Sequence, residues 1–324
     1  MVETHVHFPT DISLLWDAIR KVITLTARLS EAHELTLWRQ SQFNLRQVKK
    51  DYRKVQKTKH STSQDEQKKT AQQQLVIQAH EAYLQRSTTL INKAQYTLTL
   101  KDFNSPDELL QVKEIEGFIA HAHRQIAQIT RRVIHGEKIP HREKVFSIFQ
   151  PHTEWISKGK AGVPVELGLK TCVLEDQYGF ILHHRVMQKE TDDQIAVRMV
   201  TESQSRYADL TVCSFDKGFH SPDNQKELKK HLKLVVLPKK GRLNQQEKVH
   251  ETADEFRAAK RQHSAVESAI NALEVHGLDT CPDHGIDGFK RYISLAVVSR
   301  NIQKLGAELR KIENPPDKKR KRAA

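Results

Sequence analysis

Cysteine is scarce in this chain. The 324 residues contain three well-separated cysteines, Cys172, Cys213 and Cys281. They form no disulfide framework, and no cysteine or histidine pairs have the spacing of a structural zinc motif. This pattern argues against a small disulfide-stabilised secreted domain and indicates a reducing cytoplasm.

Long apolar runs are also missing. No segment approaches the roughly 18 consecutive apolar residues of a membrane-spanning helix, and residues 1–10 do not have the pattern of a signal peptide. Hydrophobic residues still make up 37% of the chain, which is enough to fill a core. The sequence therefore predicts a folded protein with one large domain or two, and no membrane partner.

Acidic residues are outnumbered by basic ones. There are 53 Lys and Arg residues against 40 Asp and Glu residues, which gives a formal net charge of +13. An excess of this size favours a polyanionic partner, first nucleic acid and second an acidic membrane surface. Residues 314–324 are expected to form a basic, disordered tail that attracts DNA.

The first part of the chain favours helices. Apolar residues recur every three or four positions over residues 15–29 and 109–133, as on one face of a helix. Between them, residues 46–60 are basic on several sides, which fits either a solvated helix of a bundle or a DNA-facing arm. Turn residues around Gly136 mark a boundary, so residues 11–135 are expected to form a helical domain.

Residues 136–313 alternate between β-rich and helical segments. The predicted order is a hairpin (165–187), a helix (192–205), a strand (210–215), a helix (224–231), a strand (234–237) and further helices. Residues 1–10 alternate at period two like the tail of a strand, but nothing before them completes it. This order predicts an α/β fold with a mixed sheet, and it matches the middle and end of a ribonuclease-H-like fold.

Asp216 is the first candidate site residue. The apolar run 210–215 ends on this acid, and Lys217 and Gly218 come directly after it. A carboxylate at the carboxyl end of a buried strand lies where α/β folds place their chemistry. The alternative is an ordinary turn, in which Asp and Gly are common. Glu267 is a second candidate, on a helix that faces a sheet, although single acids on helices are usually solvated.

Three segments together carry a family resemblance. They are Asp-Lys-Gly-Phe-His-Ser-Pro at 216–222, Lys-Gly-Arg-Leu at 240–243, and His-Ser-Ala-Val-Glu-Ser-Ala-Ile-Asn-Ala-Leu at 263–273. These segments resemble the DDE transposases of bacterial insertion sequences, over essentially the whole chain. Pro-His-Thr-Glu-Trp-Ile at 151–156 narrows the resemblance to the ISNCY-type group.

The resemblance implies a ribonuclease-H-like catalytic core, without its first strand here and with a large helical insertion. Asp216 and Glu267 would be the second and third acids of a site for two Mg²⁺ or Mn²⁺ ions, because hard cations prefer carboxylate oxygens. The implied partners are terminal-repeat DNA, target DNA and further copies of the chain, in the bacterial cytoplasm. Basic residues near the site would hold phosphates, and the candidates are Lys158, Lys160, Lys217, Lys239, Lys240 and Arg242.

The match to the family pattern is incomplete. In the family, the first catalytic Asp ends a strand shortly before the stretch that stands here at 8–11, so residues 1–10 correspond to the segment after that strand. Gln150, His263 and Glu274 also differ from the residues usual at those places. We therefore expect a truncated transposase that does not cut DNA by itself.

Two other classes of function are compatible with the sequence. One is a non-catalytic remnant that binds transposon ends or joins a full-length transposase. The other is a helical scaffold in which the sheet is incidental. Metal binding that is lost when Asp216 and Glu267 are replaced by alanine would argue against the scaffold.

Overall fold

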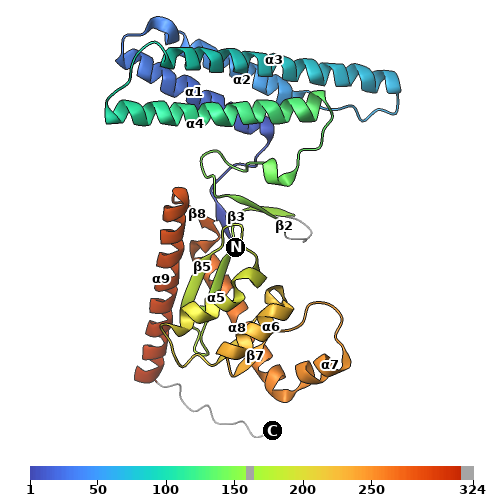
Figure 1. The fold of residues 1–324 in the computed structure, drawn as a ribbon, viewed down its shortest axis with the longest axis vertical. Coiled ribbons are helices and arrows are strands. Elements are labelled where there is room, and N and C mark those ends of the chain that lie inside the picture. The colour runs from blue at the N-terminus through green and yellow to red at the C-terminus, as the bar shows by residue number, and fades with distance from the viewer. Residues whose placement is uncertain (158–163, 315–324) are drawn as a thin grey trace. The chain divides into compact units, whose positions relative to one another are not determined.

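The chain folds into two compact units (Figure 1). The computed structural model describes residues 1–157 and 164–314, apart from the side chains of residues 262–268. The helical unit is formed by residues 6–151, and the sheet unit by residues 1–5 together with the chain from His152 onward. The sheet unit is therefore built from two stretches that are far apart in sequence.

Four long helices make up most of the helical unit. They run alongside one another in Figure 1 and are α1 (Asp11–Ala32), α2 (Ser41–Lys57), α3 (Glu66–Leu98) and α4 (Pro106–Ile129). Short turns accompany them: η1 (Thr36–Trp38), η2 (Thr130–Ile134) and η3 (His141–Glu143). Arg132 Nε lies 2.6 Å from Asp11 Oδ2, and His33 Nε2 lies 3.1 Å from Glu108 Oε1. These pairs at opposite ends show that α1 and α4 are antiparallel.

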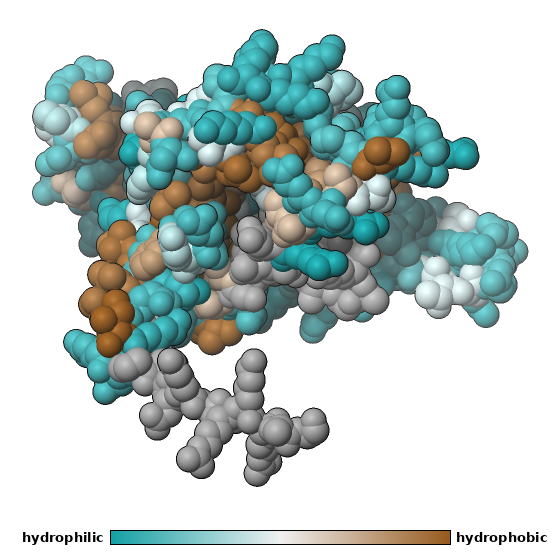
Figure 2. Space-filling view, turned by 90° about the horizontal axis from the view of Figure 1, so that it is seen from below, coloured by the Kyte–Doolittle hydropathy of each residue, from teal (hydrophilic) through white to brown (hydrophobic). Residues whose placement is uncertain are grey.

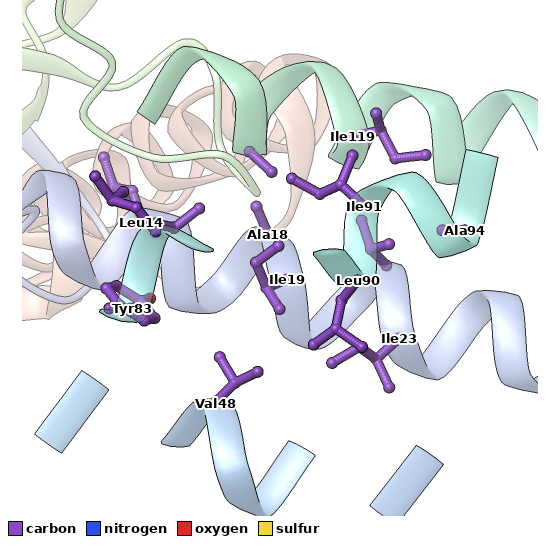
Figure 3. Close-up of a cluster of buried hydrophobic side chains, with 14 of the residues drawn as sticks. Leu14, Ala18, Ile19, Ile23, Val48, Tyr83, Leu90, Ile91, Ala94 and Ile119 are labelled. Atoms are coloured by element: carbon purple, nitrogen blue, oxygen red, sulfur yellow. The ribbon is translucent and has the colours of Figure 1, made fainter. Parts of the chain in front are cut away.

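The apolar faces of the four helices share one core (Figure 3). The labelled side chains are Leu14, Ala18, Ile19 and Ile23 of α1, Val48 of α2, Tyr83, Leu90, Ile91 and Ala94 of α3, and Ile119 of α4. On α2, only Val48 and Val55 are buried, and Lys49, Lys50 and Arg53 are exposed. The basic segment 46–60 therefore lies largely on a helix of the bundle whose cations face solvent.

The helical unit extends past the boundary that the sequence predicted. Gly136, with a φ of +68°, ends the helical stretch as expected. However, Val145 and Ile148 pack against the helix core, so residues 136–151 belong to the helical unit. The glycine marks the end of a helix, whereas the apolar side chains after it set the limit of the unit.

In the described part of the sheet unit, eight strands form three small sheets. A four-stranded sheet has the order β2 (Glu154–Ser157), β3 (Val165–Leu169), β1 (Val2–Thr4) and β8 (Thr280–Cys281). The other two sheets pair β4 (Thr171–Glu175) with β5 (Ile181–Val186), and β6 (Val212–Ser214) with β7 (Leu234–Val236). β1 is antiparallel to β3 and parallel to β8, so the α/β class with a mixed sheet is confirmed.

The start of the chain corrects one prediction. Residues 1–10 were expected to be only a remnant after a missing strand, yet Val2–Thr4 form an inner strand. Val2 and Thr4 are buried, and hydrogen bonds to neighbours on both sides satisfy the backbone of even so short a strand. The described strands form separate sheets, and β1 pairs with β3 and β8 and not with β6.

The order of elements after β3 agrees with the prediction. The hairpin β4–β5 is followed by α5 (Asp192–Gln204), β6, η4 (Lys217–Phe219), α6 (Pro222–His231), β7, α7 (Gln245–Thr252), α8 (Asp254–Leu273), η5 (Glu274–Leu278), β8 and α9 (Gly285–Glu313). Two details go beyond the prediction: the run 165–174 is divided at Lys170 between two sheets, and residues 154–157 form β2. Within the described ranges, no helix has both the length and the apolar character of a membrane span.

Candidate functional site

Asp216 stands directly after β6, as the sequence predicted. The preceding Phe215 is buried, and its backbone N–H donates to the Val236 carbonyl of β7 at 2.9 Å. Asp216 itself is exposed, and its Oδ1 accepts a hydrogen bond of 2.7 Å from the Lys217 N–H, which caps η4. The acid is therefore held by the end of a strand and still reaches solvent.

The parallel pairing of β6 and β7 fixes one edge of the candidate site. Val212 faces Leu234 and Ser214 faces Val236 in the ladder. Since parallel strands end at the same edge, the loop that begins at Asp216 and the loop after β7 emerge on one side. The second loop, residues 238–244, carries three of the predicted DNA-binding residues.

Asp192 and Asp193 begin α5 beside this edge, and the sequence did not predict them as site residues. A Cβ added to Gly218 would lie 2.9 Å from Asp192 Oδ2, so the glycine allows η4 to approach α5 closely. Lys170 Nζ lies 3.5 Å from the same oxygen, and a hydrogen bond with the Thr191 side chain lowers the pKa of Asp193. Two acids at a predicted helix start were the signal that could have pointed to this place. The sequence did not show that Gly218, about 25 residues further along, would be their neighbour.

Asn224 ties α5 to the loop that carries Asp216. Its Nδ2 donates to the Asp193 carbonyl at 2.6 Å and to the Phe219 carbonyl at 2.9 Å. The side chain is almost fully buried, so both bonds lie away from water. One amide group thereby fixes the position of η4 relative to the start of α5.

Glu267 lies on α8. The structure describes the position of this helix but not that of the Glu267 side chain. α8 contacts both β6 and β7, which brings it to the sheet that carries Asp216. Phe256 near one end of α8 and Leu273 at the other are buried. The side chain of Glu267 is outside the described residues, so the distance between the two acids stays a prediction.

The described part of the candidate site does not form a complete metal site. Among the described side chains, no three His, Cys, Asp or Glu residues gather closely enough to hold a cation. Burial raises the pKa of Cys172 and of Cys213 to about 12, so these thiols stay protonated at neutral pH and are poor metal ligands. The carboxylates that the structure describes around η4 are Asp216, which caps it, and Asp192, which lies against Gly218.

The predicted DNA-binding residues differ in their surroundings. Lys217, Lys240 and Arg242 are exposed. Lys239 Nζ instead lies 2.7 and 2.8 Å from the two carboxylate oxygens of Glu247, which compensates its charge. This hydrogen-bonded pair lowers the pKa of Glu247. Two further predicted residues, at positions 158 and 160, lie outside the described ranges.

Comparison with known proteins finds no relative: no protein family, no curated protein sequence and no solved structure matches the chain significantly.

Proposed function

We propose that this protein binds DNA as a ribonuclease-H-like protein of the DDE transposase type, with Asp216 and Glu267 as carboxylate ligands for a divalent cation. The observation that carries the proposal is the position of Asp216 at the carboxyl end of a parallel strand pair against which α8 packs. This edge is where open α/β sheets bind ligands. The net charge of +13 supports a polyanionic partner.

The carboxylates suit Mg²⁺ or Mn²⁺ because both cations prefer oxygen donors. When bound, two such ions would activate an attacking hydroxyl and stabilise the leaving oxygen of a phosphodiester. Among the described side chains, which do not include that of Glu267, no three histidine, cysteine or carboxylate residues gather to hold a cation. The proposal for this chain is cation and DNA binding.

Replacing Asp216 by alanine should weaken Mn²⁺ binding by at least about tenfold, since even a residue that only supports a metal ligand causes a loss of this size. Glu267→Ala should have the same effect, and isothermal titration calorimetry measures both. The matched control is Asp209→Ala, because Asp209 is also exposed but precedes β6, at the opposite edge of the strand pair. Equal Mn²⁺ affinities in all four proteins would contradict the metal site.

A second candidate function is DNA binding without any metal. It is favoured by the formal net charge of +13 and by the exposed Lys240 and Arg242, which can contact phosphates without a metal. In that case Asp216 is only the cap of η4, and the calorimetric titration shows no difference between Asp216→Ala and the control. Weaker DNA binding by variants of Lys240 and Arg242 would still be expected, so the two candidates can be separated.

The double variant Lys240→Glu with Arg242→Glu should bind a DNA duplex of arbitrary sequence more weakly and with a smaller dependence on salt. Each phosphate contact contributes a slope of about 0.9 in a plot of log affinity against log salt, so the loss of two contacts lowers the slope by about two. Fluorescence anisotropy at several salt concentrations measures both the affinity for DNA and the salt slope.

The control for this variant is Lys229→Glu with Lys233→Glu. These lysines are also exposed, and they lie at the end of α6 and just before β7, at the other edge of the strand pair. The change in net charge is identical in both double variants. If both double variants weaken DNA binding equally, the weakening comes from the change in net charge and not from lost contacts at the proposed edge.

A further inference from the structure

One face of α9 exposes a regular row of large apolar side chains, here called the α9 ridge. Its members are separated by steps of three, four, three, four and three residues, and each is between 50% and 75% exposed: Leu295, Val298, Ile302, Leu305, Leu309 and Ile312. Alternating steps of three and four are the a and d positions of a heptad repeat. The spacing is that of a coiled-coil seam.

A different face of α9 holds the helix on its own unit. Phe289, Ile293 and Val297 are buried there, at steps of four residues. The Asn301 side chain accepts from the Ile181 N–H and donates to the Ile181 carbonyl, both at 2.9 Å. The core of the sheet unit therefore does not use the α9 ridge.

The α9 ridge is larger than the scattered apolar residues of an ordinary surface. Figure 2 shows brown apolar side chains at the surface near the C-terminal end of α9, and Figure 1 shows the helix along the border of the sheet unit. Contiguous apolar patches of this kind on soluble proteins mark interaction sites. A helix with heptad spacing fits another helix with the same spacing.

We propose that the α9 ridge binds the α9 ridge of a second copy of this chain in an antiparallel helix pair. The twofold axis would pass between Ile302 and Leu305. The layers on either side then pair Ile302 with Leu305, Val298 with Leu309, and Leu295 with Ile312. Every layer joins one leucine to one β-branched residue, so side chains of different shape interdigitate. A surface that is complementary to itself forms a closed dimer.

The residues beside the α9 ridge select the antiparallel direction. In a parallel pair, Glu308 of one copy would lie next to Glu313 of the other, and like charges at these positions repel. In the antiparallel pair, Ser299 lies next to Gly306 of the other copy. A Cβ at Gly306 would meet no atom within 4 Å in its own chain, so this side of the helix is open to close approach.

A groove at one end of the α9 ridge fits the same arrangement. It has a volume of about 230 Å³ and is lined in part by Leu273, Tyr292, Leu295 and Ser299. In the antiparallel pair, the residue of the second copy that faces Leu295 is Ile312, whose side chain is 75% exposed. The groove, whose lining also includes Ala296 and the polar His276, Arg300 and Gln303, therefore leaves room beside Leu295 for the most exposed residue of the ridge.

Sedimentation equilibrium of the full chain tests the proposal. The protein should form dimers at micromolar concentration, and Ile302→Glu with Leu305→Glu should be monomeric, because the variant places four carboxylates in the two layers beside the twofold axis. Its circular dichroism should stay unchanged, since both side chains are exposed in the single chain. Lys290→Glu with Arg310→Glu puts new carboxylates at exposed positions of α9 outside both the ridge and the groove, and should remain dimeric. A monomeric parent protein, or a dimeric ridge variant, would overturn the proposal.

Disulfide trapping tests the direction. A mixture of chains carrying Leu295→Cys and chains carrying Ile312→Cys should form a mixed disulfide dimer under mild oxidation, whereas each variant alone should not. The parent protein, with its own three cysteines, is the background control. Efficient trapping of either variant alone would indicate a parallel pair and reject the antiparallel arrangement.

Discussion

Replacing Gly168 by alanine should destabilise the sheet unit by about 3 kcal/mol and detach β1 from β3. Gly168 faces Glu3 in the antiparallel ladder, and a Cβ on it would lie 2.0 Å from the Val2 carbonyl oxygen and 2.7 Å from Glu3 Cα. Overpacking typically costs about 1–3 kcal/mol. We expect the upper end because backbone atoms cannot rotate away as a side chain can.

Urea unfolding and amide hydrogen exchange measure this change. The Glu3 N–H donates to the Asp279 carbonyl at 2.7 Å, so its exchange should accelerate if β1 is displaced. The control is Gly117→Ala in the helix α4, where a Cβ meets no atom within 4 Å. This substitution should stabilise the helical unit by about 0.5–1 kcal/mol, the usual difference between the two residues inside a helix. Unchanged stability and exchange in Gly168→Ala would show that β1 and β3 are not so close.

The second large effect is expected for Ile19→Ala in the helical unit. Ile19 is fully buried at the centre of the core shown in Figure 3. Removing a fully buried isoleucine side chain costs about 2–5 kcal/mol, from the lost transfer free energy and from the cavity that remains. Close packing by α1, α3 and α4 limits collapse of the cavity, so a loss of about 4 kcal/mol is expected in urea unfolding.

Leu110→Ala is the matched control for this substitution. Leu110 lies on α4, is 66% exposed, and loses a side chain of similar size. Surface substitutions of this kind usually change stability by less than about 0.5 kcal/mol. Equal losses for Ile19→Ala and Leu110→Ala would mean that the helices do not pack as Figure 3 shows.

The two units are stabilised by different kinds of contact. The helical unit depends on side chains from neighbouring helices that fill one core, whereas β1 depends on backbone hydrogen bonds to segments more than about 160 residues away. A substitution therefore tests the contacts of the unit in which it lies.

Local signals in the sequence determined most of the elements. The periodic run 109–133 lies on α4, which Ser105 and Pro106 start, and on the adjoining η2. The Ser105 side chain accepts from the Glu108 N–H at 3.3 Å. Gly179, with a φ of +85°, closes the turn of the β4–β5 hairpin. The place of Asp216 after β6 was also predictable, since an apolar run and a turn lie next to each other in the chain. These features depend on residues a few positions apart.

Tertiary structure decided what depends on distant residues. β1 and β8 contain three and two residues, too few for a reliable pattern, and they are strands only because of their pairing partners. The contact between Gly218 and Asp192 and the pairing of Lys239 with Glu247 also needed the chain to fold.

The sequence predicted further helices after the strand 234–237, and α9 is the last of them. Only the folded chain shows that Phe289, Ile293 and Val297 face the core while the α9 ridge stays exposed. The physical reason is that periodicity reports which residues share a face, whereas burial depends on which other segments come to cover it.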